Sequence, residues 1–196
     1  ADPSQTTDAS DPTADEDETE NPDPLAPPSP GTYSYERIPV AGFESAIRAA
    51  FHPSGDYALI LAQYDTVYIY HWASQAVTSL SVGSNRRMQL TDVAFAADGS
   101  CAWITASQTQ DGNTAMILRF DDAAYRAQTE TSDPNVLVTA FTPSMNGKLA
   151  KAIAIPWDGS FPIVVFESGQ SGNYIWTLRN FHPITGGFET LYTSIN

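Results

Sequence analysis

The chain has 196 residues, of which 23 are acidic and 9 are basic, giving a formal net charge of −14. A chain this acidic has no general attraction for phosphate backbones, so we do not expect it to bind nucleic acid. No apolar run approaches the roughly 18–20 residues of a membrane-spanning helix. The single cysteine, Cys101, excludes a disulfide framework and a cysteine-based zinc site.

Residues 1–30 differ sharply from the rest of the chain. They hold nine acidic side chains, no basic one, and seven of the fourteen prolines. Such a segment buries too little apolar surface to offset the entropy lost on ordering, and charge repulsion keeps it extended. We therefore expect a disordered acidic linker over 1–30 and a folded domain over 31–196. The linker resembles the leader of a bacterial lipoprotein or secreted protein, which implies an extracellular, periplasmic or cell-surface domain with any lipid anchor upstream of the chain.

The folded part reads as short strands separated by turns, with no long amphipathic helix. Valine, isoleucine, threonine and aromatic residues dominate the runs, as in half-buried sheets. A strand is predicted over Tyr33–Val40. The first repeating unit, about 47–82, then has predicted strands over Ile47–Phe51, Tyr57–Ala62, Thr66–Trp72 and Ala76–Leu80.

Two further units follow the same pattern. The second, about 91–130, has predicted strands over Thr91–Phe95, Cys101–Ala106, Thr114–Phe120 and Tyr125–Thr129. The third, about 151–194, has predicted strands over Lys151–Ile155, Pro162–Glu167, Asn173–Arg179 and Phe188–Thr193. Phe51 and Phe95 are 44 positions apart, within the spacing of propeller blades. The longer step to the third unit predicts an insertion at 132–150, in which Val136–Phe141 forms an extra strand.

The segment 50–60, AFHPSGDYALI, resembles the strand–turn–strand opening of a WD-repeat-like β-propeller blade, and the segment 95–100, FAADGS, repeats it. Asp65 and Asp111 lie where such blades place an aspartate before their third strand, and Phe120-Asp121 lies at the place of the family's Trp-Asp pair. The Gly-His dipeptide of the family is missing throughout, so its buried hydrogen-bonded tetrad is not carried over. The resemblance implies an all-β, β-propeller-like fold of three four-stranded antiparallel blades.

Three blades are fewer than the four to eight of a closed propeller. The chain would then be part of a longer propeller, or two copies would form a six-bladed ring, or another protein would cover the open blade faces. We therefore expect a protein partner or self-association.

No catalytic constellation stands out in the sequence. The three histidines, His52, His71 and His182, have no ligand-like spacing and are expected in turns or at the surface. Asp98 and Asp158 precede glycines in equivalent turns, where aspartate is common. Trp103 and Trp176 are expected in the core and Trp157 at the surface, while Cys101 is expected to be a small buried residue. No metal and no cofactor are predicted.

The candidate binding residues lie in loops, which carry function more often than strands do. They are Arg86, Arg87, Asp111, Trp157, Gln170 and Asn173. The favoured hypothesis is a non-enzymatic binding or scaffold module that contacts a protein, or a glycan, through inter-blade loops. Two alternatives stay open: part of a propeller enzyme of the lactonase, lyase or glycosidase type with its site at the central channel, and a structural repeat that assembles through open blade faces.

Overall fold

The structure, a computed structural model, describes eight stretches of the chain, all within the unit Val40–Asn196. They are residues 46–62, 64–82, 88–108, 114–127, 138–141, 148–159, 161–170 and 173–194. The expected linker over 1–30 and the expected strand Tyr33–Val40 lie outside the described residues.

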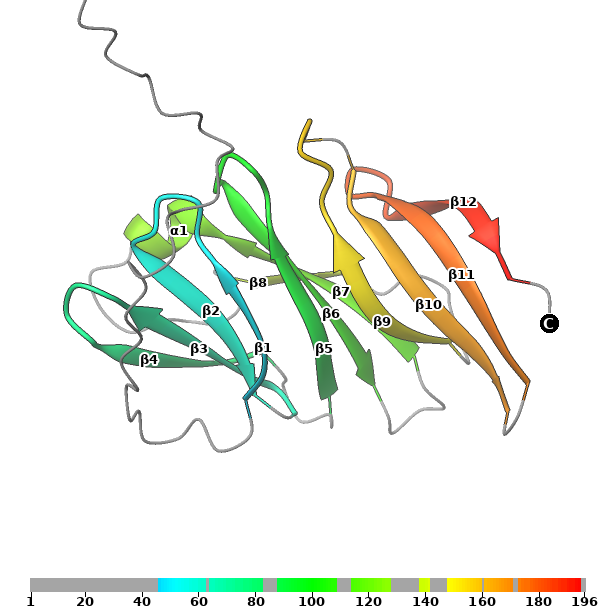
Figure 1. Cartoon of the computed structure of the whole chain (residues 1–196), viewed down its shortest axis with the longest axis horizontal. Helices are drawn as coiled ribbons and strands as arrows, with labels where there is room; N and C mark the ends of the chain where they lie inside the picture. The colour runs from blue at the N-terminus through cyan, green and yellow to red at the C-terminus, as the bar shows by residue number, and fades with distance from the viewer. Residues whose placement is uncertain are drawn as a thin grey trace, which may run out of the picture. The chain divides into compact units, whose positions relative to one another are not determined.

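The described strands form three four-stranded antiparallel sheets (Figure 1). The first sheet has the order β1-β2-β3-β4, so each strand pairs with the next one along the chain. Its strands are β1 (Ala46–Phe51), β2 (Tyr57–Ala62), β3 (Thr66–His71) and β4 (Val77–Ser81). All four lie within a residue or two of the predicted bounds, because tight turns punctuate this part of the sequence.

The second sheet has the order β5-β6-β7-β8 and corrects one expectation. Its strands are β5 (Met88–Phe95), β6 (Cys101–Gln108), β7 (Thr114–Asp121) and β8 (Val138–Phe141). The predicted strand Tyr125–Thr129 is wrong, because Asp122–Ala127 is a helix, α1. The outer strand β8 lies instead within the segment expected to be an insertion.

A side-chain cap explains why the chain turns into a helix after β7. The Asp121 carboxylate accepts the backbone N–H of Ala124 at 2.9 Å, which satisfies one of the free donors of the first turn. Asp122 in the first turn and Arg126 in the last complement the helix dipole and form an ion pair four residues apart.

The third sheet has the order β12-β11-β10-β9, again a simple meander. Its strands are β9 (Lys148–Ala154), β10 (Ile163–Gln170), β11 (Asn173–His182) and β12 (Gly187–Thr193). The three sheets therefore are three blades of a β-propeller-like all-β fold, as the sequence predicts.

Two apolar clusters hold neighbouring blades together. One joins residues such as Leu59 and Ile69 of the first blade to Ile104 and Phe120 of the second. The other joins Trp103 of the second blade to residues of the third, namely Ile153, Val164, Phe166 and Phe181. Strand β6 is buried along its whole length, because alternate side chains enter the two clusters. The middle blade is thus covered on both faces.

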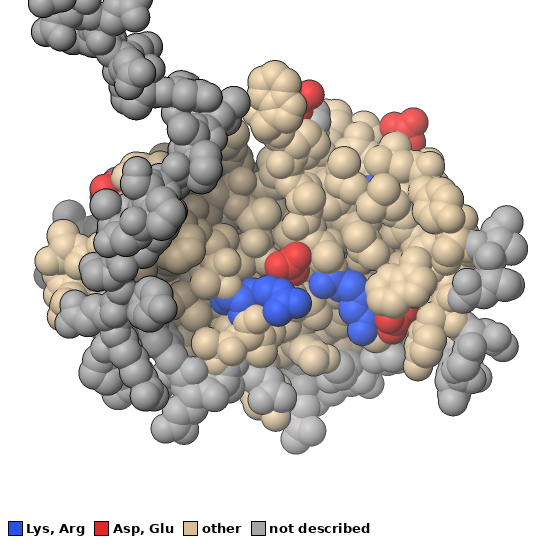
Figure 2. Space-filling model, viewed as in Figure 1, with Lys and Arg blue, Asp and Glu red and all other residues tan. Residues whose placement is uncertain are grey.

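The first strands of the blades, together with β10, carry a row of paired charges. Strand β5 lies beside β1 and β9. Arg48 lies 3.7 Å from the Asp92 carboxylate, and Lys151 lies 3.3 Å from Glu167. The second carboxylate oxygen of Asp92 accepts the backbone N–H of Ile153 at 3.0 Å, so Asp92 links the first strands of all three blades. Figure 2 shows basic and acidic side chains gathered in a row across this face.

The face of the third blade that points away from the second remains apolar and exposed. Thr177 and Phe181 of β11 point toward the second blade and are buried. Because side chains alternate along a strand, Trp176 points the other way, and its exposed fraction is 41%. Trp176 was expected in the core, but no further described sheet covers this face.

Candidate binding site between the second and third blades

Three equivalent turns join the first and second strands of the blades. They span residues 52–55, 96–99 and 156–159. In each, the last residue is a glycine whose N–H donates to the carbonyl oxygen of the first residue, at 2.8, 2.9 and 3.1 Å. These glycines have φ of 77°, 74° and 72°, the left-handed region that favours glycine. Since the backbones match, the side chains of the turns can be compared position by position.

At the junction of the first and second blades, the first junction, the first turn position is His52. Its side chain is only 7% exposed. The Nδ1 atom lies 2.6 Å from the hydroxyl oxygen and 3.1 Å from the backbone nitrogen of Ser54, and Nε2 donates to the carbonyl oxygen of Gly99 in the next blade at 3.1 Å. The ring stacks on Tyr57 at 4.8 Å and meets the Phe95 ring edge-on at 5.2 Å. His52 and Tyr57 thereby fill the first junction.

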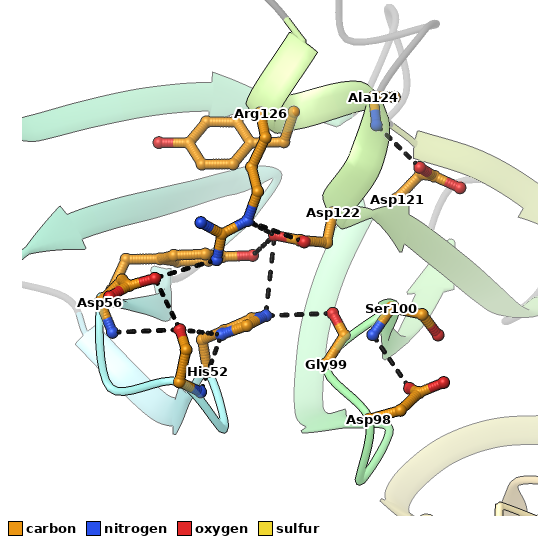
Figure 3. Close-up of polar contacts among 12 residues, drawn as sticks. His52, Asp56, Asp98, Gly99, Ser100, Asp121, Asp122, Ala124 and Arg126 are labelled. Carbon is orange, nitrogen blue, oxygen red and sulfur yellow. Dashed lines mark hydrogen bonds and ion pairs between the residues drawn. The ribbon is translucent and has the colours of Figure 1, made fainter.

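An arginine from the second blade closes the same junction (Figure 3). The Arg126 guanidinium donates to both Asp122 oxygens at 2.9 Å and to Asp56 at 3.2 Å. Its Cζ atom lies 5.7 Å from the centre of the Tyr57 ring. The Tyr57 hydroxyl donates to Asp122 at 2.8 Å. This junction therefore holds a guanidinium against an aromatic ring and two carboxylates.

The network shifts the pKa values of its members. Burial, and then the hydrogen bond to Asp122, raise the pKa of Tyr57. The hydrogen bond from Ser54, and then that from Arg126, lower the pKa of Asp56. The phenol therefore stays neutral and the carboxylate stays charged at neutral pH. The arrangement is suited to holding two blades together.

At the junction of the second and third blades, the second junction, the same positions hold small residues. Ala96 stands where the first junction has His52, and Cys101 stands where it has Tyr57. A Cβ atom built on Gly99 would meet the His52 ring nitrogen at 2.6 Å, whereas one built on Gly159 would meet nothing within 4 Å. The space that the His52 ring occupies at the first junction is therefore open at the second.

A pocket of about 430 Å³ lies at the second junction. Trp157, with an exposed fraction of 90%, and Phe161, at 36%, bring aromatic surface to it. Asp98 and Asp158 bring carboxylates. The backbone N–H of Ser100 holds the Asp98 carboxylate at 2.9 Å and lowers its pKa. The described lining residues are Ala96, Ala97, Asp98, Ser100, Cys101, Trp103, Ile155, Trp157, Asp158, Gly159, Phe161, Pro162 and Pro183.

Of the six predicted binding residues, the structure places one at this pocket, Trp157. Gln170 and Asn173 are paired with each other where β10 and β11 meet, at the opposite end of β10 from the pocket. The structure does not bring them together with Trp157. The other three, Arg86, Arg87 and Asp111, lie outside the described residues.

Other single-residue expectations have mixed outcomes. Cys101 and Trp103 are buried, as predicted. His52 does lie in a turn, but it is buried between blades rather than at the surface. His182 is half-exposed and its ring lies 4.4 Å from that of Phe161. Ala96 and Cys101 were not predicted as site residues; the sequence signal for them is the comparison of equivalent positions in the three turns, where His52 and Tyr57 are replaced by small residues.

The described residues hold no group of three or more His, Cys, Asp or Glu side chains that could bind a metal ion. None of the helices in the described part of the chain is long and apolar enough to cross a membrane.

No protein-family model matches the chain, and no curated protein matches it in sequence. Three solved structures resemble it in fold. The β-propeller domain of Cps50 (Swd1) from Myceliophteria thermophila has a TM-score of 0.47 and 8% identity, over 76% of this chain and 45% of that one. The tricorn protease has a TM-score of 0.46 and 10% identity, over 70% and 14%. A protein from Lactobacillus plantarum has a TM-score of 0.46 and 13% identity, over 76% and 41%. The chain thus spans less than half the length of each.

Proposed function

We propose that the domain is a non-enzymatic binding module that holds a segment of a partner protein against the pocket at the second junction. One observation carries the proposal. Two junctions share the same turn backbones, yet His52 and Tyr57 fill the first while Ala96 and Cys101 leave the second open. A ligand can supply the missing contacts only at the second junction.

The size and lining of the pocket support this function. Ligand pockets commonly enclose about 300–1,000 Å³, a range that includes this one. Tryptophan is among the residues that most often dominate protein–protein binding energy, and Trp157 is almost fully exposed beside the pocket. Its turn is anchored at both ends to strands of one sheet, so a partner would meet a rigid surface.

The paired charges on the first strands and on β10 favour binding over catalysis. A propeller enzyme would need a free carboxylate or a carboxylate pair there. Asp92 instead pairs with Arg48 and with a backbone N–H, and Glu167 pairs with Lys151. These groups act as cross-links between strands.

We further propose that residues 1–30 tether the domain to a cell surface or to a secreted assembly. Their acidic, proline-rich composition supports an extended spacer. The coding sequence upstream of this chain tests the proposal, since an export signal or an anchoring cysteine should be encoded there.

The binding function is tested by photo-crosslinking with the full chain. A photoreactive phenylalanine analogue replaces Trp157, and in a matched control it replaces Ile184, which is 91% exposed and does not line the pocket. We expect a specific cross-linked partner from position 157 alone.

The double variant Ala96→His/Cys101→Tyr then rebuilds the side chains of the first junction at the second. It should abolish the cross-link while leaving the far-ultraviolet circular dichroism, which reports the strands, close to that of the parent. Equal cross-linking by the filled variant would show that partners bind elsewhere.

A further inference from the structure

We propose that the pocket at the second junction binds an arginine side chain presented by a basic segment of the partner protein. This inference rests on the proposed binding function and names the chemistry of its ligand. The pocket combines aromatic rings, two carboxylates and no lysine or arginine among its described lining residues.

Charge complementarity supports a cationic ligand. Asp98 and Asp158 both line the pocket, and the lowered pKa of Asp98 keeps that carboxylate ionised at neutral pH. His182, a titratable residue outside the lining, lies against Phe161 with its Nε2 3.9 Å from the Glu189 carboxylate. Residues 31–196 by themselves hold 14 acidic and 9 basic side chains, so a cation approaching the folded part meets a net negative charge.

The first junction provides an internal precedent for arginine. There the Arg126 guanidinium lies over the Tyr57 ring and donates to Asp56 and Asp122. The second junction offers the same two kinds of group, aromatic rings and carboxylates, although from other positions of the turns. At the first junction the guanidinium comes from the same chain, whereas at the second junction a partner protein would supply it.

The local chain path explains why the described elements next to this site do not fill it. After β7, the second blade continues into α1, which carries Arg126 to the first junction. After β11, the third blade makes a tight turn over residues 183–186 and enters β12 directly. Pro183, which lines the pocket, takes the place of Asp122, so no helix follows to supply a guanidinium.

Arginine suits the site better than lysine does. A guanidinium is planar, stacks on aromatic faces and bonds carboxylates through two donors, whereas an ammonium is a compact and more strongly hydrated charge. A neutral sugar would use the Trp157 ring but would gain less than a cation from the two carboxylates.

The test uses the full chain and the peptide acetyl-Gly-Gly-Arg-Gly-Gly-amide, followed by the NMR signal of the Trp157 indole N–H. Peptides with citrulline or lysine in place of arginine, and maltotriose, are titrated in parallel. We expect saturable shifts with the arginine peptide, weaker ones with lysine, and none with the neutral citrulline peptide or the sugar.

Variants locate the binding. Asp98→Asn/Asp158→Asn should weaken arginine binding by about two- to thirtyfold, the range expected when two exposed ion pairs are lost. Trp157→Ala, followed by calorimetry, should weaken it by a similar factor. The control variant is Asp65→Asn, since Asp65 lies in a turn of the first blade. This variant should bind the arginine peptide as tightly as the parent does.

Three results would overturn the inference. They are equal binding of the arginine and citrulline peptides, binding of maltotriose in preference to the arginine peptide, and arginine binding that neither pocket variant weakens. None of these results contradicts the proposed binding function. That function fails separately if the filled variant Ala96→His/Cys101→Tyr still cross-links its partner.

Discussion

The sharpest prediction compares two glycine-to-alanine substitutions, Gly99→Ala and Gly159→Ala. Both glycines end equivalent turns, with φ of 74° and 72°. An alanine in this left-handed conformation costs about 1–2 kcal/mol of unfolding free energy. That cost is shared by the two variants, so it cancels in their difference. What remains is the effect of the neighbouring side chain.

The neighbours differ because only the first junction is filled. A Cβ atom on Gly99 would lie 2.6 Å from Nε2 and 2.7 Å from Cε1 of His52, whereas one on Gly159 meets nothing within 4 Å. The His52 ring cannot simply retreat, since Tyr57 and Phe95 pack against it. Overpacking of this kind costs about 1–3 kcal/mol. Gly99→Ala should therefore cost about 2–5 kcal/mol in total, against about 1–2 for Gly159→Ala.

Urea unfolding followed by circular dichroism measures both variants, and thermal melting should separate them by about 2–12 °C. Combining Gly99→Ala with His52→Ala completes a double-mutant cycle. Removing the ring removes the clash, so the cycle should show a coupling of about 0.5–3 kcal/mol. Equal costs for the two glycine variants, or additive effects in the cycle, would refute the claim that His52 fills one junction and leaves its counterpart open.

Three further outcomes follow from single contacts. Tyr57→Phe keeps the ring but removes the hydroxyl that donates to Asp122, so urea unfolding should show a loss of about 0.5–1.5 kcal/mol; no loss would mean that this bond adds nothing to stability. The backbone N–H of Ala124 lowers the pKa of Asp121, so the carboxylate contributes stability above its unfolded pKa that is lost as the pH falls through the folded value. In Asp121→Asn the melting temperature should therefore fall less between about pH 5 and about pH 2, and a parallel profile would contradict the cap. The isolated chain should associate at tens of micromolar through the exposed face around Trp176, and sedimentation equilibrium should show less association in Trp176→Ser; a constant monomer mass for the parent would exclude this contact.

The sequence predicts the strands of the first blade well because each strand is bounded by residues with strong local preferences. The turn HPSG and the alternation in TVYIYH both act within a few residues, so no distant contact is needed to interpret them. The same local cues place the first three strands of the second blade. Periodicity within a segment is thus enough to reveal a blade.

The fourth strand of the second blade shows where local cues fail. Tyr125–Thr129 contains β-type residues at the expected distance after β7, yet the Asp121 cap and the three alanines of α1 favour a helix there. The true outer strand, Val138–Phe141, falls within the extra strand predicted over Val136–Phe141, but its place beside β7 follows from pairings such as that of Ile117 with Phe141. Such pairing across 24 positions is invisible in either segment alone.

The candidate site was still harder to predict, because the pocket exists where two residues have small side chains. Nothing in the segment around Ala96 and Cys101 marks it as unusual, since small residues are common in turns and buried strands. Their importance becomes clear only when they are compared with His52 and Tyr57. These two residues occupy the same positions one blade earlier and close the junction there.

In a fold built from repeated blades, each junction between blades can be compared with the next. Because the turn backbones match, equivalent residues of two blades face the same turn of the next blade. A large side chain that is present at one junction and absent at the other therefore indicates that the two junctions differ in function. At the second junction the change coincides with a tryptophan that is 90% exposed and with two aspartates that line the same pocket. If the pocket were only a gap in packing, neither the exposed tryptophan nor the two aspartates would be needed. Their convergence on a single pocket is what a binding site requires, and the Ala96→His/Cys101→Tyr variant tests it by giving the second junction the side chains of the first.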